Sequence, residues 1–476
     1  MLRRFSFAIS LFLLPCWAQE TSEITGRIVD ASGSVAPGAA VEIRQVSTDV
    51  KWDVKTNEDG YYTQALLPPS DYRVTVRLAG FKQDVRNVTL EVEQVARLDF
   101  TLQVGSLTET IQVMATTPLL ESSNASIGQV VETQAIADLP LNGRNYLDLA
   151  KLSIGTTEPS GIGTSGTSGD RAKTGGAFIA NGTRSDQNNF ILDGIDNNAK
   201  IADLSNNTNV VIQPSVDALG EFKVETNTYS PEYGHSAGAV LSATTKTGTN
   251  KIHGSAFEFL RNDAVDARNF FLAPGTPKQE LRQSQYGATT GGPVIKNKTF
   301  LFGSWQGSRT NSGTTMVETL PTAANLAGDF SSLLPKTAIN DPLATVQNAA
   351  GTNVKSAFPG NIIPQSRIAQ TSAKLDPLIP AQNVPGVANN YVVSPVTVNN
   401  RDAWDSRGDQ NFSNADKLFL RYSYYKLYVN NPGPLPAPLI GSSNFQQSIN
   451  NQSGHQAVLG ETHVFRASIV NDFRAG

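Results

Sequence analysis

The sequence predicts a mainly β protein, and three observations support this fold class. Short segments that alternate polar and apolar residues recur from Ser22 to Val104, with turn signals between them. From about Asn250 the alternation continues in longer segments of about ten residues, as in strands that cross a membrane. No uninterrupted apolar stretch reaches the ~18 residues of a membrane-spanning helix. If a membrane is crossed, we therefore expect strands to cross it.

Composition and charge exclude one class of partner. The chain has 476 residues, with 38 Lys and Arg against 42 Asp and Glu, and a formal net charge of -4. Charged residues make up 17%, below the ~25% of an ordinary soluble protein. The chain has no basic block, so we expect no nucleic acid partner.

The N-terminus predicts export. Arg3 and Arg4 precede an apolar run from Phe5 to Leu14 that is too short to span a bilayer, and a small-residue cleavage site ends at Ala18. Residues 1–18 are therefore predicted to be a signal peptide, and the alternatives are a buried N-terminal helix and a lipoprotein signal at Leu13 to Cys16. Cys16 is the only cysteine and leaves with this peptide, so the mature chain is expected to contain no disulfide.

The first folded unit is predicted to be a β-sandwich. Asp71 to Leu78 and Arg97 to Val104 alternate strictly and indicate half-buried strands. Asp59-Gly60 is typical of a hairpin turn. About seven short strands in roughly 80 residues are typical of a sandwich.

Five motifs in this unit carry a resemblance to a known family. They are ITGRIVD, PGAAVEI, TNEDGYY, LPPSDYRVTV and AGF. Their order resembles the carboxypeptidase regulatory-like domain, a transthyretin-like sandwich grouped with carbohydrate-binding-like folds. The resemblance implies such a domain over residues 19–104, and it implies no catalytic residue.

The middle of the chain contains three further motifs. Leu139 to Leu152 predicts a turn and a short helix with Tyr146, Leu149 and Leu152 on its apolar face. The second motif, Ala180 to Asp196, predicts strands with tight corners at Asn181-Gly182 and Asp193-Gly194. The third motif, Val216 to Gly254, predicts a short helix followed by strands at Phe222 to Thr226 and Ala239 to Thr245. In this order the motifs resemble the mixed α/β plug of TonB-dependent outer-membrane receptors, in the Oar-like branch that carries the regulatory-like sandwich. The plug is expected over residues 105–249.

A β-prone segment from Leu107 to Ala115 lies between the two units. It is either the last strand of the sandwich or a TonB-box-like segment, which would add to the sheet of a TonB-like energy-transducing protein through main-chain hydrogen bonds. The candidate TonB-box residues are Thr110, Ile111, Gln112, Val113 and Met114.

The remaining residues, 250–476, are expected to begin a transmembrane β-barrel. In His253 to Asn262, Phe257 and Phe259 share one face. Lys417 to Tyr425 alternates more clearly, with Leu418, Leu420, Tyr422 and Tyr424 on one face and Arg421 and Ser423 on the other. Apolar-out and polar-in alternation with aromatic ends is typical of barrel strands. A soluble sandwich strand has the same period and remains an alternative.

The connections support a barrel. Gln285 to Trp305 predicts two strands joined by a Gly-Gly-Pro turn and a Lys-Asn-Lys turn, and Gly408 to Tyr425 resembles a hairpin of an Oar-like barrel. Between them, Gly313 to Arg401 predicts a long irregular loop, which suits an extracellular loop of a receptor better than a soluble domain.

Chain length predicts that the barrel is incomplete. A barrel that holds a plug needs about 22 strands of about ten residues. Residues 250–476 provide 227 residues, and the long loop uses many of them. We expect six or seven barrel strands, with another strand beginning in Ala467 to Gly476, and thus the N-terminal part of a longer receptor.

The sequence does not predict an enzyme. It has no HExxH, G-x-S-x-G or P-loop motif. The four histidines are far apart in sequence and show no metal-ligand spacing: His235, His253, His455 and His463. No metal, cofactor or catalytic residue is expected.

The resemblance implies a receptor in outer-membrane lipid that takes up a bulky, unidentified extracellular solute by active transport. Two alternatives remain open. One is an outer-membrane adhesion or surface-binding protein without transport. The other is a secreted soluble β protein that binds carbohydrate.

Overall fold

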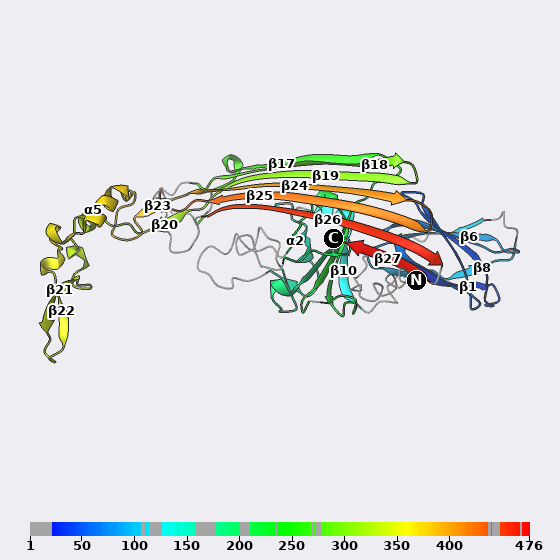
Figure 1. The fold of residues 1–476 in the computed structure, drawn as a ribbon, viewed down its shortest axis with the longest axis horizontal. Coiled ribbons are helices and arrows are strands. Elements are labelled where there is room, and N and C mark those ends of the chain that lie inside the picture. The colour runs from blue at the N-terminus through cyan, green and yellow to red at the C-terminus, as the bar shows by residue number, and fades with distance from the viewer. Residues whose placement is uncertain are drawn as a thin grey trace, which may run out of the picture.

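The chain is mainly β and forms a sandwich, a plug, a long curved sheet and an extended arm (Figure 1). The computed structural model describes residues 21–105, 110–113, 126–139, 141, 143–158, 178–199, 210–234, 236–268, 270–271, 278–436, 439, 448–466 and 469–476. The predicted signal peptide lies outside these residues. No helix in the described part of the chain is long and apolar enough to cross a membrane.

The N-terminal sandwich has two sheets. Its strands are β1 (Ser22–Asp30), β2 (Ala40–Gln45), β3 (Lys51–Lys55), β4 (Tyr61–Leu67), β5 (Ser70–Arg77), β6 (Gln83–Leu90), β7 (Val95–Arg97) and β8 (Phe100–Leu102). In one sheet β1 pairs with β4, β7 and β8, and in the other the order is β3-β2-β5-β6-β9, where β9 is Thr110–Val113. Alternate residues of these strands point inward and form one apolar core.

Two predictions for the sandwich have different outcomes. The Asp59-Gly60 turn is confirmed, because Gly60 has φ +75° and β4 begins directly after it. The single strand predicted from Arg97 to Val104 is wrong. The segment is broken into β7 and β8, and two residues, Leu98 and Asp99, lie between them. The carbonyl oxygen of Leu98 lies against Gly26 of β1.

The plug is a mixed α/β unit with its own apolar core. Its elements are β10 (Ile127–Val131), α1 (Thr133–Asp138), α2 (Leu147–Ala150), β11 (Thr156–Thr157), β12 (Ile179–Ala180), η1 (Ser185–Gln187), β13 (Asn189–Leu192), β14 (Ile195–Asp196), η2 (Val216–Ala218), β15 (Leu219–Asn227) and β16 (Val240–Thr245). The five-stranded sheet has the order β10-β15-β16-β13-β14, and β13 runs parallel to β16.

The predicted plug motifs are largely confirmed. Both predicted corners adopt left-handed backbone angles, with φ +51° at Asn181 and φ +50° at Asp193, each followed by a glycine with φ +76°. Around the short helix α2, Tyr146 and Leu149 are buried as expected, but Leu152 is 65% exposed. Leu152 follows the end of α2, so the helical spacing no longer applies to it.

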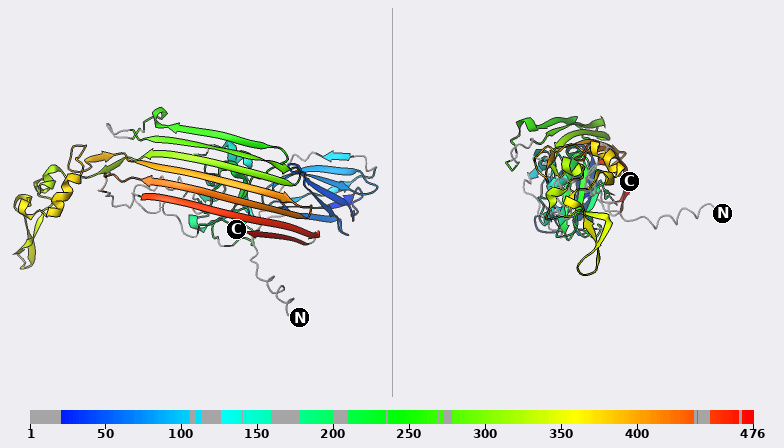
Figure 2. Two further views of the ribbon diagram at one scale, coloured as in Figure 1. Left: turned by 45° about the horizontal axis from the view of Figure 1, so that its top comes forward. Right: turned by 90° about the vertical axis from the view of Figure 1, so that its left-hand side faces the viewer.

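A seven-stranded antiparallel sheet arches over the plug (Figures 1 and 2). Its strands are β17 (His253–Asn262), β18 (Leu281–Ile295), β19 (Thr299–Gly313), β24 (Val396–Asn411), β25 (Asp416–Asn431), β26 (Ser448–Arg466) and β27 (Ile469–Ala475). The count agrees with the expected six or seven strands. Within the described residues β17 and β27 each pair with one strand only, so the sheet is open.

The predicted faces hold for β25, and in β17 Phe257 and Phe259 share one face as predicted, but this face is turned inward. Leu420 and Tyr422 are 54% and 44% exposed on the convex face, whereas Arg421 is buried. Phe257 and Phe259 point instead toward the plug, where the guanidinium of Arg144 lies 4.1 and 5.1 Å from their ring centroids. A cation–π contact therefore places this aromatic pair on the inner face.

One predicted turn is wrong. Gly291-Gly292-Pro293 lies within β18, where a register shift between Pro293 and Ile295 accommodates the missing N–H of proline. The Lys-Asn-Lys segment forms the turn, with Asn297 at φ +63°.

The segment predicted as an irregular loop forms an ordered arm that extends beyond the ends of the strands (Figure 1). Its elements are β20 (Met316–Glu318), α4 (Ala323–Leu326), η4 (Ser331–Leu333), β21 (Asn340–Gln347), β22 (Asn353–Ala357), η5 (Pro359–Asn361), η6 (Gln365–Arg367), α5 (Gln370–Leu375), η7 (Asp376–Leu378) and β23 (Tyr391–Val393).

Two buried side-chain amides stabilise this arm. Asn361 donates to the carbonyls of Phe330 and Thr337, and Asn390 donates to the carbonyl of Leu320. Side-chain bonds to the backbone carry no periodic sequence signal, which is why alternation did not reveal the arm.

We predict that Gly26→Ala destabilises the sandwich. An added Cβ would lie 1.9 Å from the carbonyl oxygen of Leu98 and 2.9 Å from the ring of Tyr62. The backbone of Leu98 is fixed between β7 and β8, so the loss in unfolding free energy should be about 3 kcal/mol. Thermal denaturation of the full chain, followed by limited proteolysis at sites within residues 21–105, would measure it. Gly234→Ala meets no atom within 4 Å and serves as the control. If both variants unfold at the same temperature, the close approach of Leu98 to Gly26 does not limit the stability of the sandwich.

Candidate functional site

The inner face of the long sheet contacts the plug through buried charges. The centre of this contact is Asp193, at the tight turn between β13 and β14. One of its oxygens lies 3.0 Å from Nη1 of Arg407 on β24, and the other lies 2.8 Å from Nε of Arg421 on β25. Thr245 at the end of β16 donates both its N–H and its hydroxyl to the same carboxylate. One plug carboxylate thus joins two barrel arginines.

Burial alone would raise the pKa of Asp193, but Arg407 and Arg421 outweigh burial and lower it. A lowered carboxyl pKa means that the contribution to stability is present above the ordinary carboxyl range and is lost only as pH falls through the lowered value. The contact between plug and sheet is therefore expected to stay charged in mildly acidic medium.

Arg421 is the largest fully buried side chain of the described residues, with an exposure of 0%. Besides Asp193, it donates to the hydroxyl of Ser423 at 2.8 Å and to the side-chain oxygen of Gln456 at 2.7 Å. Its Nε–Asp193 contact is an ion pair without hydrogen-bond alignment. A buried guanidinium requires such partners because an uncompensated buried charge is strongly destabilising.

A second polar contact lies further along the same strands. Arg401 of β24 donates to the side-chain and main-chain oxygens of Gln213 in the plug, at 2.5 and 2.7 Å. The hydroxyl of Ser215 lies 2.7 Å from that of Ser304 on β19. Plug residues just before η2 are therefore bonded to two strands of the long sheet.

The convex face of the sheet is apolar and aromatic. Trp305 and Trp404 lie opposite each other on β19 and β24 with ring centroids 5.5 Å apart, and the centroid of Tyr424 on β25 lies 4.7 Å from that of His455 on β26. Aromatic rows of this kind flank the apolar band of membrane barrels. The two faces of the sheet thus differ as the alternation of β25 predicts.

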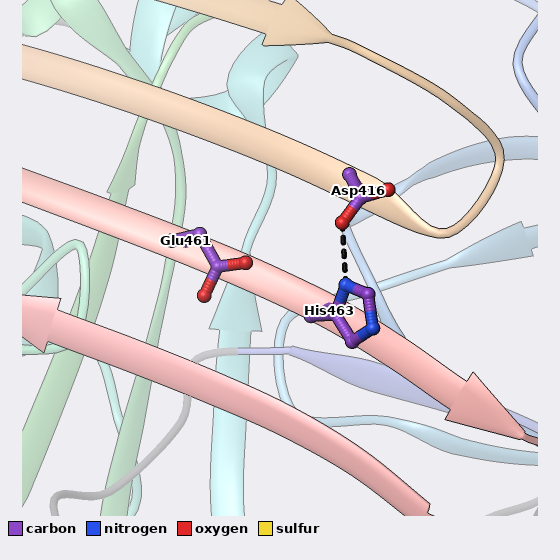
Figure 3. Close-up of side chains that lie close together, drawn as sticks. All are labelled: Asp416, Glu461 and His463. Atoms are coloured by element: carbon purple, nitrogen blue, oxygen red, sulfur yellow. Dashed lines mark hydrogen bonds and ion pairs between the residues drawn. The ribbon is translucent and has the colours of Figure 1, made fainter. Parts of the chain in front are cut away.

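A histidine and two carboxylates meet at the end of β25 and β26 (Figure 3). Asp416 lies opposite His463 across the two strands, and Glu461 lies two residues before His463. Potential ligand atoms of the three lie within 4.8 Å of one another. The sequence did not reveal this group because cross-strand register, not spacing along the chain, brings it together. Asp416 and His463 already pair with each other, so the group is satisfied as an ion pair across the hairpin.

The candidate TonB-box residues Thr110 to Val113 form strand β9. This strand runs parallel to β6, with Gln83 opposite Thr110 and Arg86 opposite Val113. The fifth candidate, Met114, lies outside the described residues. The structure therefore places the segment at the edge of the sandwich.

Comparisons with known proteins agree with this architecture. Residues 23–103 match the family described as the carboxypeptidase regulatory-like domain, and residues 244–476 match the outer membrane beta barrel domain. The chain is 25% identical over 307 residues to the TonB-dependent transporter Oar of Myxococcus xanthus, covering 61% of this chain and 27% of that protein. It thus spans about a quarter of the length of this relative.

Two solved structures also resemble the chain. One is the outer membrane transporter YddB of Escherichia coli, with a TM-score of 0.42 and 12% identity over 71% of this chain and 37% of that one. The other is a mutant of the ferric enterobactin receptor of Pseudomonas aeruginosa, with a TM-score of 0.37 and 8% identity over 71% and 38%.

We predict that Asp193→Asn loosens the seating of the plug. The substitution leaves Arg421 buried without a carboxylate partner from the plug, at an expected cost of about 3 kcal/mol. Protease cleavage of plug residues in receptor-containing membranes, followed against urea concentration, would measure the shift.

The matched control is Asp402→Asn. Asp402 pairs with Arg309 at 2.9 Å, but both side chains are about one-third exposed. Loss of such a pair changes stability by less than about 1 kcal/mol. If both variants shift the urea midpoint equally, the cluster around Asp193 does not hold the plug.

Proposed function

Because the chain belongs to the TonB-dependent outer-membrane receptors that carry an N-terminal carboxypeptidase regulatory-like domain, we propose that it imports a bulky solute across the outer membrane. A TonB-like energy-transducing protein drives the import. In this proposal residues 1–18 direct export, 19–104 form the regulatory-like domain, 105–249 form the plug and 250–476 begin the barrel.

The observation that carries the proposal is the polar contact between the plug and the concave face of the sheet. Asp193, Arg407 and Arg421 form its centre, and Gln213 and Arg401 extend it. Water can replace hydrogen bonds and ion pairs one at a time, whereas an apolar core must be broken as a unit. A plug held in this way can shift while its own core stays intact.

The segment Thr110 to Met114 is the proposed point of force transfer, and we name it the coupling segment. The described part of it, β9, is an edge strand that offers main-chain groups to a partner strand. Tension on this segment acts on the rest of the plug, which follows the segment in the chain.

The solute is proposed to bind first at the outer end of the barrel, where the arm of residues 314–395 is exposed. The arm carries four acidic and four basic residues and so has no net charge. This balance favours a neutral or mixed ligand over a strongly charged one. Carbohydrate binding by the sandwich is a further part of the proposal and rests on its transthyretin-like fold alone.

Surface binding without transport is the second candidate function. The observation that favours it is the length of the ordered arm, which reaches far beyond the strands (Figure 1). Solute accumulation that depends on the proton gradient would distinguish transport from adhesion. The match to an outer membrane beta barrel domain supports the outer membrane as the location of either function.

We predict that Val113→Pro abolishes energised uptake without preventing insertion into the outer membrane. Proline removes a main-chain N–H that a partner strand would use. Untargeted mass spectrometry of solutes depleted from the medium, in receptor-expressing and deletion cells with and without a protonophore, would measure uptake.

Val113→Ala keeps the N–H and is the matched control, so it should retain uptake. Membrane fractionation would verify that both variants insert. Normal gradient-dependent depletion in cells with Val113→Pro would remove the coupling-segment assignment.

A further inference from the structure

A hollow of about 800 Å³ lies on the convex face of the long sheet, over β18, β19, β24, β25 and β26. Its floor is a row of small side chains, because Thr290, Gly303 and Ser406 lie opposite one another across β18, β19 and β24. Tyr422 of β25 ends this row, opposite Ser406. We call this hollow the trough. Its volume is in the range of pockets that bind small molecules.

Aromatic side chains form the wall of the trough on the side of the arm. They belong to the next row of the same face, in which Trp305, Trp404, Tyr424 and His455 lie opposite one another on β19, β24, β25 and β26. Floor and wall are two residues apart along each strand, so the trough runs across the strands beside the aromatic row. From β18 to β25 its floor is about 14 Å long, at ~4.8 Å between strands.

The trough is open above Gly303. A Cβ added to this glycine would meet no atom within 4 Å beyond its chain neighbours. At Gly307, further along the same strand and on the same face, an added Cβ would lie 2.5 Å from the ring of Tyr286. The open space is therefore confined to the row of small side chains.

Polar groups at the end of the trough are already hydrogen-bonded within the protein. The hydroxyl of Ser406 donates to the main-chain carbonyl of Tyr422 at 3.2 Å, and the hydroxyl of Tyr422 lies 2.8 Å from Nδ1 of His455. The side chains of Trp404 and Tyr422 are nevertheless 49% and 44% exposed. The surface that they offer to an occupant is aromatic, and it favours an apolar occupant.

The position of the trough along the strands places it at the outer end of the hydrocarbon layer. On its far side from the arm lie the exposed apolar side chains of Leu301, Leu420 and Leu459. Beyond the aromatic row, toward the arm, Asp402 and Lys426 follow on the same face. Aromatic side chains of membrane barrels lie at the level of the lipid headgroups. The trough is one row to the apolar side of that level, so it faces acyl chains.

An exposed cation lies just beyond the aromatic row. Lys426 follows Tyr424 by two residues and is exposed on the same face. Asp402 lies directly opposite Lys426, but both oxygens of this carboxylate lie 2.9 Å from Nη2 of Arg309. The next carboxylate of this row, Glu258, is on β17, four strands away at about 19 Å. A phosphate group at headgroup level would thus complement the ammonium of Lys426.

We propose that the trough binds one acyl chain of an outer-membrane lipid, with the phosphate group of that lipid beside Lys426. The chain packs on Gly303 and against the rings of Trp305 and Trp404. An unfilled hollow would leave these side chains without contact atoms, whereas a chain that fills it gains dispersion contacts along the whole floor. The proposal concerns the lipid-facing surface and does not depend on import of a solute.

The same strand segments contact the plug on their other face. The hydroxyl of Ser304 lies 2.7 Å from that of Ser215, and the main-chain N–H of Ser215 donates to Asp405 at 3.4 Å. Ser304 and Asp405 alternate along β19 and β24 with the residues of the trough. A bound lipid therefore packs directly behind the segments that hold the plug, and its binding should raise the unfolding temperature of the receptor.

Filling the trough tests the proposal. In Gly303→Phe the phenyl ring would occupy the space above the floor. The full-length receptor is extracted from outer membranes in mild detergent and measured by native mass spectrometry, and any retained lipid is identified by fragmentation. We expect the wild type to retain one phosphate-bearing lipid and Gly303→Phe to retain it about tenfold less.

The matched control is Gly408→Phe. Gly408 lies opposite Leu301 and Leu420, one row outside the trough on the same face. A Cβ there approaches no atom more closely than a side-chain methyl of Leu301, at 3.2 Å. This variant should keep the lipid, and heat-dependent mobility in gel electrophoresis verifies that both variants fold.

Three results would overturn the proposal. The first is a wild-type receptor without bound lipid, or with detergent only. The second is equal retention of lipid by the two phenylalanine variants. The third is a wild-type dimer without lipid that Gly303→Phe converts to a monomer, because the trough would then bind a second copy of the chain.

The phosphate contact has its own test. Lys426→Gln removes the cation and leaves the trough open, so retention of the lipid should fall about fivefold. Lys374→Gln, on α5 of the arm, should leave retention unchanged. In mixed micelles, phosphatidylglycerol should raise the unfolding temperature of the delipidated wild type more than diacylglycerol, which lacks the phosphate. If the two lipids raise it equally, Lys426 does not bind a phosphate and that part of the proposal is wrong.

Discussion

The ion cluster around Asp193 is the interaction on which the position of the plug depends. Arg421 is fully buried, and a buried guanidinium is tolerated only when a carboxylate and further acceptors surround it. The plug supplies that carboxylate from a two-residue turn whose left-handed backbone aims it at β24 and β25. The inner face of the sheet thus requires the plug against it, and the plug and the sheet each complete the other's charge balance.

The chain places its apolar cores inside the units and polar contacts between them. The sandwich and the plug each have a separate buried cluster, and Tyr425 is the one sheet side chain among the described residues grouped with the plug core. Arg401 with Gln213, and Lys223 with Glu93, are representative of the contacts between units. Each unit can therefore remain folded when its neighbour moves, because polar contacts can be exchanged for water.

Local patterns in the sequence predicted the elements that local forces determine. Alternation located β25, and the Asp-Gly pair located the turn at Asp193, since only residues that tolerate a positive φ form it readily. The partners of Asp193 could not be predicted, because Arg407 is 214 residues away and reaches it only through the register of the sheet. The pairing of β9 with β6 and the meeting of Asp416 with His463 depend on register in the same way.

The order of strands in the plug connects the sandwich to the ion cluster. The turn between β6 and β7 carries Glu93, whose carboxyl lies 4.0 Å from the ammonium of Lys223 on β15. β15 is hydrogen-bonded to β16, and β16 is bonded to β13. β13 leads directly into the turn that carries Asp193. Backbone ladders resist sliding because a one-residue shift reverses every side chain. A displacement of β15 therefore moves the sheet as a body and strains the contacts of Asp193 with both arginines. In this arrangement the docking of the sandwich and the seating of the plug are two ends of one hydrogen-bonded sheet, so a change at either end is felt at the other.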